Sequence, residues 1–175
     1  YILFSRLYSY RDIRLKKFPI IGFLTVFIFQ GCWIFLLVQQ SFHQSISNQK
    51  LLLGLCASCL IGAVYPLSQI YQHQQDKADG VRSISYLLGY KGTFGFAGFL
   101  FLLGAGLFLF IHQHEVIVCA IFLLAHFPII IYFLYWAIKV WQDSKNASYK
   151  HTMEMNSIAA IGMSVCFIIL NFYKA

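Results

Sequence analysis

The chain has 175 residues, of which 59% are hydrophobic, 18% aromatic and only 11% charged, and its formal net charge is +7. A soluble domain usually carries about 25% charged residues, so this chain has too few charges to cover a water-exposed globule. The composition also excludes intrinsic disorder, and the length and cysteine content exclude a small secreted disulfide-linked protein. The first question is therefore how often the chain crosses a bilayer.

Five stretches of the chain are suited to cross a bilayer, which requires about 20 mostly apolar residues. In chain order they are Phe18–Val38, Leu51–Ile70, Thr93–Ile111, Val116–Ile138 and Met155–Tyr173. Each stretch is apolar on all sides, which does not fit an amphipathic helix at a water-facing surface. We therefore predict an all-α fold, a polytopic transmembrane helical bundle with five complete spans in a lipid bilayer.

The residues before the first span contain a further apolar segment, Tyr1–Tyr8, which resembles the last turns of another helix. The segment is too short to cross the bilayer and carries neither a helix start signal nor the pattern of a signal peptide. We therefore expect residues 1–175 to form a single transmembrane domain that is truncated at its amino terminus and begins with the end of a preceding span.

The basic residues are distributed unevenly over the loops. All 13 Lys and Arg residues except Lys50 and Lys174 either precede the first span or follow the second or fourth span. Segments separated by two crossings lie on one side of the membrane, and the side rich in Lys and Arg is the cytoplasmic one. Topology thus accounts for the positive charge, and we expect no nucleic-acid partner. We predict a multi-pass protein of a bacterial cell membrane, with basic loops in the cytoplasm.

Several cysteines and one histidine lie inside the predicted spans. Cys56 and Cys59 form a C-x-x-C pair, a spacing that places two small residues on one helix face. We interpret these and the other cysteines as packing residues. His126 lies close to Pro128 in the fourth span. It either lines a cavity, as ionisable groups in spans often do, or bonds as a neutral ring to a carbonyl that Pro128 leaves free.

The segment after the second span changes abruptly from apolar to polar. If the helix continues through this segment, four oxygen-bearing side chains share one face: Gln69, Gln72, Asp76 and Asp79. Oxygen ligands suit Mg²⁺, which usually completes its shell with water and substrate phosphates. Lys77 and Arg82 are close in the sequence and able to pair with phosphate oxygens. One interpretation of this segment is an oxygen-rich cation site at the cytoplasmic rim of the helical bundle, where the second span leaves the membrane.

The alternative interpretation is an ordinary cytoplasmic loop, in which Asp76 and Asp79 are solvated and Gly80 ends a helix. The D-x-x-D spacing alone favours this alternative. A second feature follows directly, since Gly80–Gly89 is a short amphipathic stretch between two glycines. Its apolar residues recur at helical spacing: Val81, Ile84 and Leu87 or Leu88.

Taken together, the acidic cluster, the sequence Gly-Val-Arg-Ser-Ile and the following Leu-Gly resemble the second aspartate motif of the UbiA superfamily of intramembrane prenyltransferases. The stretch Tyr8–Gly22 is similar to the basic loop between the family's fourth and fifth spans. Three spans follow the motif, as in the family, so the chain resembles spans five to nine of nine. The resemblance implies that the family's first aspartate motif would precede Tyr1.

The resemblance also implies an activity and a set of site residues. The activity is transfer of a prenyl group from a prenyl diphosphate to an aromatic or other lipophilic acceptor, with Mg²⁺ assisting departure of the diphosphate. Asp76 and Asp79 are the implied catalytic residues, and Asp76 is expected to hold Mg²⁺ together with either Gln72 or Asp79. The usual motif is D-x-x-x-D, and Gln72 stands in place of its first aspartate. The implied diphosphate contacts are Lys77, Arg82, Arg14 and Lys16.

Two other functions remain open at this stage. A non-catalytic member of the family is supported by the uncharged Gln72. A fragment of a small-molecule transporter is supported by His126, but it requires a continuous polar stripe, and the first two spans contain few polar residues. Because half of the metal site would precede Tyr1, we expect the 175 residues alone to lack activity.

Overall fold

The computed structural model describes residues 18–42 and 45–174. Every regular element in these two ranges is a helix, which confirms the all-α prediction. Five helical segments are long and apolar enough to cross a membrane: Pro19–Ser41, Asn48–Ala78, Ile84–Ile111, Val116–Gln142 and Tyr149–Tyr173. The five predicted spans are therefore confirmed. The chain divides into two compact units, Tyr1–Ile111 and His112–Ala175.

The first span of unit 1 is not a uniform α-helix. It consists of α2 (Pro19–Val26), a π-helical segment η2 (Phe27–Trp33) and α3 (Ile34–Ser41). Pro19 is the first residue of α2. Proline lacks an amide hydrogen, but an amide at the first helical position has no partner within the helix, so no hydrogen bond is lost. The second span begins with α4 (Asn48–Gln69), where the Ser47 hydroxyl accepts a hydrogen bond from the Lys50 amide.

Small residues allow α4 to approach the first span closely. Gly54, Ser58 and Gly62 recur every four residues along α4, the spacing of close helix contacts in membranes. A Cβ placed on Gly31 in η2 would lie 2.3 Å from the Ser58 Cα. The Ser58 hydroxyl oxygen accepts a hydrogen bond of 2.8 Å from the Cys32 amide. This bond joins α4 to the π-helical segment.

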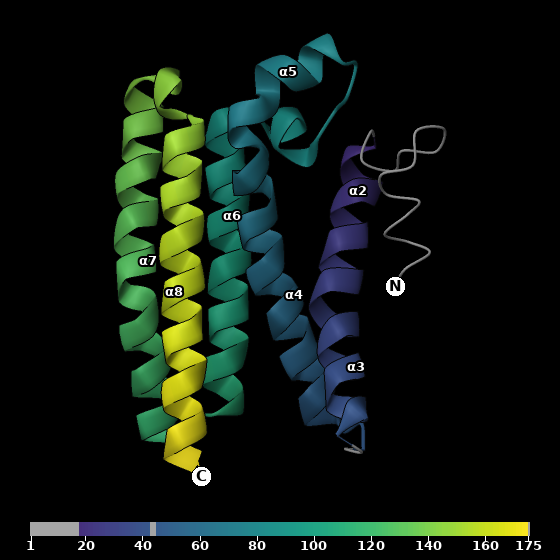
Figure 1. Cartoon of the computed structure of the whole chain (residues 1–175), viewed down its shortest axis with the longest axis vertical. Coiled ribbons are helices and arrows are strands. Elements are labelled where there is room, and N and C mark those ends of the chain that lie inside the picture. The colour runs from purple at the N-terminus through teal and green to yellow at the C-terminus, as the bar shows by residue number, and fades with distance from the viewer. Residues whose placement is uncertain (1–17, 43–44, 175) are drawn as a thin grey trace. The chain divides into compact units, whose positions relative to one another are not determined.

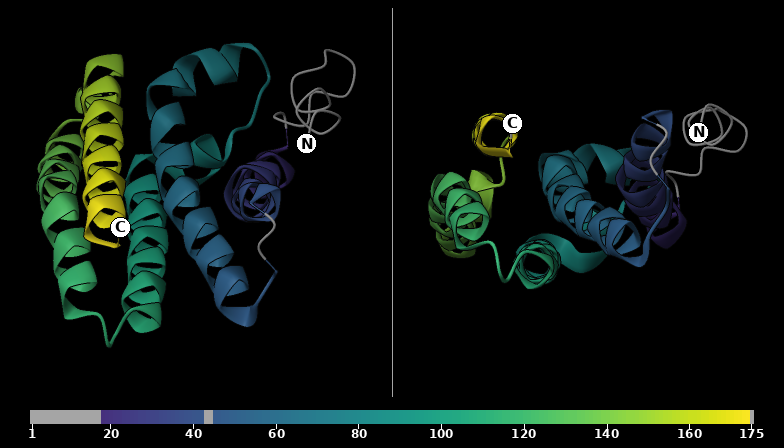
Figure 2. Two further views of the ribbon diagram at one scale, coloured as in Figure 1. Left: turned by 60° about the horizontal axis from the view of Figure 1, so that its bottom comes forward. Right: turned by 90° about the horizontal axis from the view of Figure 1, so that it is seen from below.

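Another part of the α4 surface packs against α6 (Ile84–Ile111), as Figures 1 and 2 show. The Cys56 thiol donates to the Gly104 carbonyl at 3.1 Å, and Cys59 is fully buried. A Cβ on Gly104 would lie 3.0 Å from the Cys59 Cβ. Both cysteines thus fill narrow space between α4 and α6. All five cysteines are free, in agreement with their interpretation as packing residues.

The apolar core of unit 1 lies between α2, α4 and α6. Its buried members are Phe23, Ala63, Ile84 and Leu100, with Tyr65, Leu88 and Phe96 among the half-buried residues around them. Leu87 is instead 56% exposed. Of Leu87 and Leu88, which the sequence left as alternatives for the apolar side of the amphipathic stretch, Leu88 is therefore the residue that packs into the core.

The third span begins earlier than predicted. Its helix starts at Ile84 instead of Thr93, and it contains a kink at Gly89, whose φ is 66° and ψ is 178°. This backbone conformation is accessible mainly to glycine. The residues before Gly89 therefore form a short helical segment set at a different direction from the rest of α6. The predicted span did not include this segment because polar residues interrupt the apolar run, although the helical spacing noted within Gly80–Gly89 agrees with the observed helix.

Unit 2 is a pair of antiparallel helices that lie side by side, α7 (Val116–Gln142) and α8 (Tyr149–Lys174) (Figure 1). The turn between them contains the short 3₁₀ helix η4 (Ser144–Asn146). The Asn146 side-chain amide donates to the Lys139 carbonyl at 3.1 Å, and the main-chain carbonyl of Asn146 accepts from the Trp136 indole at 2.9 Å. These bonds fix the turn onto the end of α7.

His126 in α7 is buried, and its Nδ1 lies 2.7 Å from the Phe122 carbonyl. The sequence left a cavity-lining ring and a carbonyl-bonded ring as alternatives. The bond to a carbonyl is observed, but it involves Phe122. The carbonyl that Pro128 deprives of its helical amide partner is four residues before the proline, at Leu124.

We expect Gly31→Ala to lower the stability of the protein, because the added methyl group would meet the backbone of Ser58 at 2.3 Å. Inserting a carbon into a tightly packed site costs about 1–3 kcal/mol. Gly106→Ala is the matched control, since a Cβ there would meet nothing within 4 Å. The measurement is unfolding in detergent micelles titrated with a denaturing detergent. Equal midpoints for the two variants would show that α4 and η2 do not approach this closely.

Candidate functional site

The polar segment after the second span does not continue α4 as one α-helix. The helix α4 ends at Gln69 and is followed by the 3₁₀ turn η3 (Ile70–Gln72) and the short helix α5 (His73–Ala78). A 3₁₀ turn has about three residues per turn in place of 3.6, so the residues before and after it do not keep one α-helical register. The shared face predicted for Gln69, Gln72, Asp76 and Asp79 required an unbroken helix, and this condition is not met.

The four oxygen-bearing residues are consequently distributed over different parts of the segment. Gln69 is the last residue of α4, and its side-chain oxygen is buried without a hydrogen-bond partner. Gln72 lies at the N-cap of α5, where its side-chain amide donates to the Tyr71 hydroxyl at 2.8 Å. Asp76 lies within α5, and Asp79 lies at its C-cap. Gln72, Asp76 and Asp79 therefore remain together on α5 and its caps, while Gln69 lies on the other side of η3.

Gly80 ends α5 with a φ of 63°, a left-handed conformation that favours glycine. The Val81 amide donates to the Asp76 carbonyl at 2.8 Å, and the Gly80 amide donates to the Lys77 carbonyl at 3.4 Å. These two bonds form a Schellman motif, the common way to end a helix at glycine. The role of Gly80 as a helix terminator, expected for a solvated loop, is thus present in the structure.

The Asp76 carboxylate is held in place by the start of the next helix. The Ser83 hydroxyl donates to Asp76 Oδ2 at 2.7 Å, and its oxygen accepts from the Tyr86 amide at 3.3 Å. Ser83 is therefore the N-cap of α6, at the helix end that favours a nearby negative charge. The hydrogen bond to Oδ2 orients the carboxylate.

The predicted diphosphate contacts lie partly in the described part of the chain. Lys77 and Arg82 are exposed on either side of Gly80. Among residues 18–42 and 45–174, the ion pairs within 4.0 Å lie at residues 112–115 and 150–154 and involve neither these cations nor Asp76 and Asp79. Arg14 and Lys16 lie outside the described residues. The turn therefore presents two cations and two carboxylates that these ion pairs do not engage.

The donor set at this turn suits a hard cation. Two carboxylates and one amide oxygen are available on Asp76, Asp79 and Gln72, and Mg²⁺ commonly takes one or two carboxylates from a protein. In the described ranges, no three His, Cys, Asp or Glu residues gather into a metal-binding group.

Sequence reasoning missed a buried polar cluster next to this turn. His73, Ser85 and Thr93 are all buried, and His73 Nε2 lies 2.8 Å from the Ser85 hydroxyl oxygen. The Thr93 hydroxyl lies 3.0 Å from Ser85 and donates to the Gly89 carbonyl at 2.7 Å. His73 appeared in the sequence as one of several polar loop residues, and only the fold of α5 onto α6 reveals its burial.

A second unpredicted cluster joins α7 and α8. The Tyr132 hydroxyl donates to a Glu154 carboxylate oxygen and lies 2.8 Å from His151 Nδ1. His151 also stacks on Trp136, with ring centroids 6.3 Å apart. Polar contacts of this kind hold membrane helices together. The signal in the sequence is weak, since His151 and Glu154 stand among other polar residues at the start of the fifth span.

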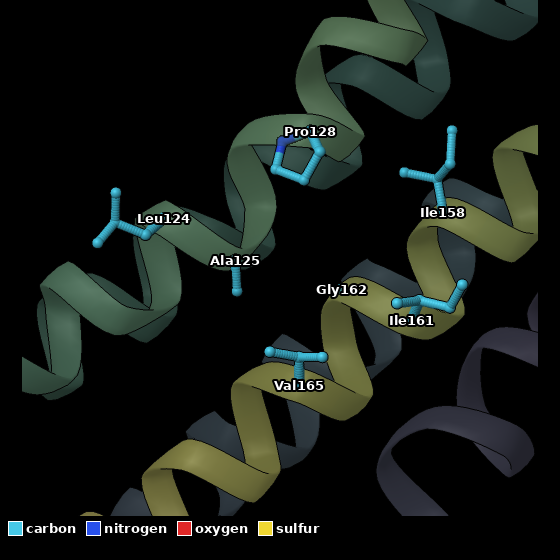
Figure 3. A pocket seen from close by; sticks show the side chains of 7 residues that line it. All are labelled: Leu124, Ala125, Pro128, Ile158, Ile161, Gly162 and Val165. Carbon is cyan, nitrogen blue, oxygen red and sulfur yellow. The ribbon is translucent and has the colours of Figure 1, made fainter.

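Unit 2 also contains an apolar groove of about 360 Å³ between α7 and α8 (Figure 3). The residues that line it are Leu124, Ala125, Pro128, Ile158, Ile161, Gly162 and Val165. None of these side chains can donate or accept a proton. The groove therefore offers shape and apolar surface, and the ionisable groups suited to catalysis lie elsewhere.

The fold is that of a polytopic membrane protein, with a polar turn that contains Asp76, Lys77, Asp79 and Arg82 between its second and third spans. A model of the UbiA prenyltransferase family matches residues 1–158 of the chain. The chain therefore belongs to the UbiA prenyltransferase family, as the sequence resemblance predicted. Neither the curated proteins nor the solved structures compared with the chain gave a match.

We expect Ser83→Ala to destabilise the start of α6, because the change removes both the N-cap acceptor of the Tyr86 amide and the donor to Asp76. Loss of an N-cap costs about 1 kcal/mol. Ser83→Thr keeps a hydroxyl and is expected to retain most of the stability. The measurement is denaturing-detergent unfolding of both variants beside the unaltered protein. A Ser83→Ala variant as stable as the Thr variant would contradict the capping role.

Proposed function

We propose that this protein is an intramembrane prenyltransferase that moves a prenyl group from a prenyl diphosphate to an aromatic or other lipophilic acceptor. Family membership supports the reaction class. The observation that carries the proposal within the chain is the Asp76 carboxylate, which Ser83 orients at a rim flanked by Lys77 and Arg82. A fixed carboxylate beside two exposed cations suits a diphosphate and its accompanying metal ion.

The proposed division of work among the residues follows from their chemistry. Asp76, with Asp79 or Gln72, would hold Mg²⁺, which when bound stabilises negative charge on a departing diphosphate. Lys77 and Arg82 would bind diphosphate oxygens, with the Arg guanidinium able to engage two oxygens at once. Charge placed in advance where the leaving group gains charge lowers the barrier to its departure.

The prenyl group itself needs an apolar environment. The C–O bond to the diphosphate breaks with its electron pair on the diphosphate, and the acceptor then forms a new bond to the prenyl carbon and releases a proton. Ile84, directly after Ser83, begins the apolar core that contains Phe23, Tyr65 and Phe96. The Phe23 ring centroid lies 5.1 Å from Phe96 and 6.4 Å from Tyr65. Aromatic faces in this core would stabilise an allylic cation and exclude water from it.

The decisive experiment uses the protein at its full length, purified in detergent. We expect a non-hydrolysable geranyl diphosphate analogue to bind in a saturable, Mg²⁺-dependent manner. Asp76→Asn should weaken that binding by at least about 10- to 100-fold, the range seen when groups that only orient metal ligands are removed. The measurement is calorimetric titration of the analogue at several Mg²⁺ concentrations.

The controls separate the candidate ligands and the candidate functions. Asp79→Asn tests whether Asp79 partners Asp76, and Glu115→Gln is a neutral control, because Glu115 pairs with His112 beyond the third span. Binding that Asp76→Asn leaves unchanged would exclude Asp76 from the site. Mg²⁺-dependent binding without turnover across a panel of lipophilic acceptors would favour the non-catalytic family member.

The proposed orientation predicts which ends of the spans face the cytoplasm. Lys- and Arg-rich loops mark the cytoplasmic side, so a cysteine at position 79 should lie inside and one at exposed position 113 outside. We expect a membrane-impermeant maleimide to label Gln113→Cys in right-side-out vesicles and Asp79→Cys in inverted vesicles. The unaltered protein is the control for its native cysteines. The opposite labelling pattern would reverse the proposed topology.

A further inference from the structure

His73 is held tightly between α5 and the first turns of α6. It is buried, and its ring stacks on Tyr90 with centroids 4.7 Å apart and an interplanar angle of 19°. Tyr86 meets the same ring edge-on at 5.7 Å. The remaining contact is polar, between His73 Nε2 and the Ser85 hydroxyl. One side chain of α5 thus contacts three residues of α6.

The hydrogen bonds around His73 admit one consistent arrangement. Each hydroxyl carries a single hydrogen. The Thr93 hydroxyl faces two main-chain carbonyls, at 2.7 Å on Gly89 and 3.1 Å on Ser85, and because carbonyls can only accept, its hydrogen is directed to them. The 3.0 Å contact between Ser85 and Thr93 must then use the Ser85 hydrogen. The 2.8 Å contact between Ser85 and His73 consequently requires a hydrogen on Nε2. His73 is therefore a donor in a chain that ends at the kink of α6.

This chain of hydrogen bonds lies beside the Asp76 contact. His73 and Asp76 are three residues apart on α5, a spacing that places two side chains on the same side of a helix. His73 bonds to Ser85, and Asp76 bonds to Ser83. A helix of six residues such as α5 has little stability of its own. Its position therefore depends on these contacts with α6.

We propose that His73 is a positioning residue for the diphosphate site: by donating from Nε2 to Ser85, it fixes α5 and thereby the Asp76 carboxylate. The inference rests on the proposed function of the Asp76 turn. His73 itself is covered by Tyr86, Tyr90 and Ser85, so it acts through Asp76. Substrate contact and proton transfer are not part of its role.

The proposed role of His73 requires a hydrogen-bond donor at Nε2, whereas a residue that only fills the core would need no donor. A glutamine at position 73 can place an amide N–H near the position of Nε2, whereas a leucine fills a similar volume without a donor. His73→Gln should therefore keep the position of α5, and His73→Leu should lose it. Ser85→Ala removes the acceptor, so its effect should match that of His73→Leu, and the double variant should be no worse than either single variant.

The test measures two properties of the full-length protein in lipid nanodiscs. The first is hydrogen exchange of the Asp79, Gly80 and Val81 amides, which bond to the carbonyls of α5. The second is Mg²⁺-dependent affinity for the geranyl diphosphate analogue. We expect His73→Leu to accelerate the exchange about 10-fold and weaken binding by a similar factor, within the range known for residues that orient metal ligands. His73→Gln should stay within about threefold of the unaltered protein in both. His126→Leu, at a buried histidine of unit 2, should leave both unchanged.

Each outcome decides the inference. Faster exchange and weaker binding in the Leu variant, with both restored by Gln, would support it. A Gln variant no better than the Leu variant, or a Leu variant that behaves like the unaltered protein, would overturn it. If exchange responds while binding does not, His73 holds the turn without positioning the site, and the inference is wrong. If the unaltered protein does not bind the analogue, the proposed function fails, and the exchange data alone report whether His73 holds α5.

Discussion

Within a bilayer, a chain can leave regular helical hydrogen bonding only where protein groups replace water as partners. Unit 1 follows this constraint at successive irregularities. The Ser58 hydroxyl accepts from the Cys32 amide inside the π-helical segment. The Ser83 hydroxyl accepts from the first turn of α6, and the Thr93 hydroxyl donates to the Gly89 carbonyl at the kink. Short hydroxyl side chains thus make these backbone irregularities possible.

The candidate site depends on the same hydroxyl groups. Ser83 satisfies the start of α6 and also orients Asp76, while Thr93 satisfies the kink and also completes the chain of bonds from His73. A site built at the rim between two spans requires the chain to turn sharply there, and the turn exposes backbone groups that need partners. The same hydroxyl hydrogen bonds therefore fold the start of α6 and hold the Asp76 carboxylate in place.

The sequence predicted the parts of the structure that depend on hydrophobicity along the chain. The spans, their number and the packing role of Cys56 and Cys59 follow from long apolar stretches and small side chains, and the structure confirms them. The family was identified from the motif that ends at Gly89 and from the stretch Tyr8–Gly22, and the family match confirms it. These features are encoded by neighbouring residues, so they can be recognised without knowledge of the fold.

The features that the sequence did not reveal depend on contacts between segments. The 3₁₀ turn before α5 breaks the register that would have placed Gln69 with Asp76. The burial of His73 requires α5 to fold back onto α6, and the choice of Leu88 over Leu87 requires the direction of the segment before Gly89. Periodicity describes a single regular helix and cannot show where two short helices meet at an angle.

The electrostatic environments of Asp76 and Asp79 explain how one turn can combine a fixed and an adaptable carboxylate. Asp76 bonds to the N-cap residue of α6, where the helix dipole stabilises negative charge. Asp79 lies at the C-cap of α5, where carbonyl groups disfavour negative charge, and it is exposed. A cation bound at the turn would relieve the unfavourable charge at Asp79 while meeting a carboxylate already oriented by Ser83. Gln72 stands where the family's motif has its first aspartate, and it carries no charge. If the proposed cation site has a second negative charge, Asp79 is the residue of this turn that would supply it.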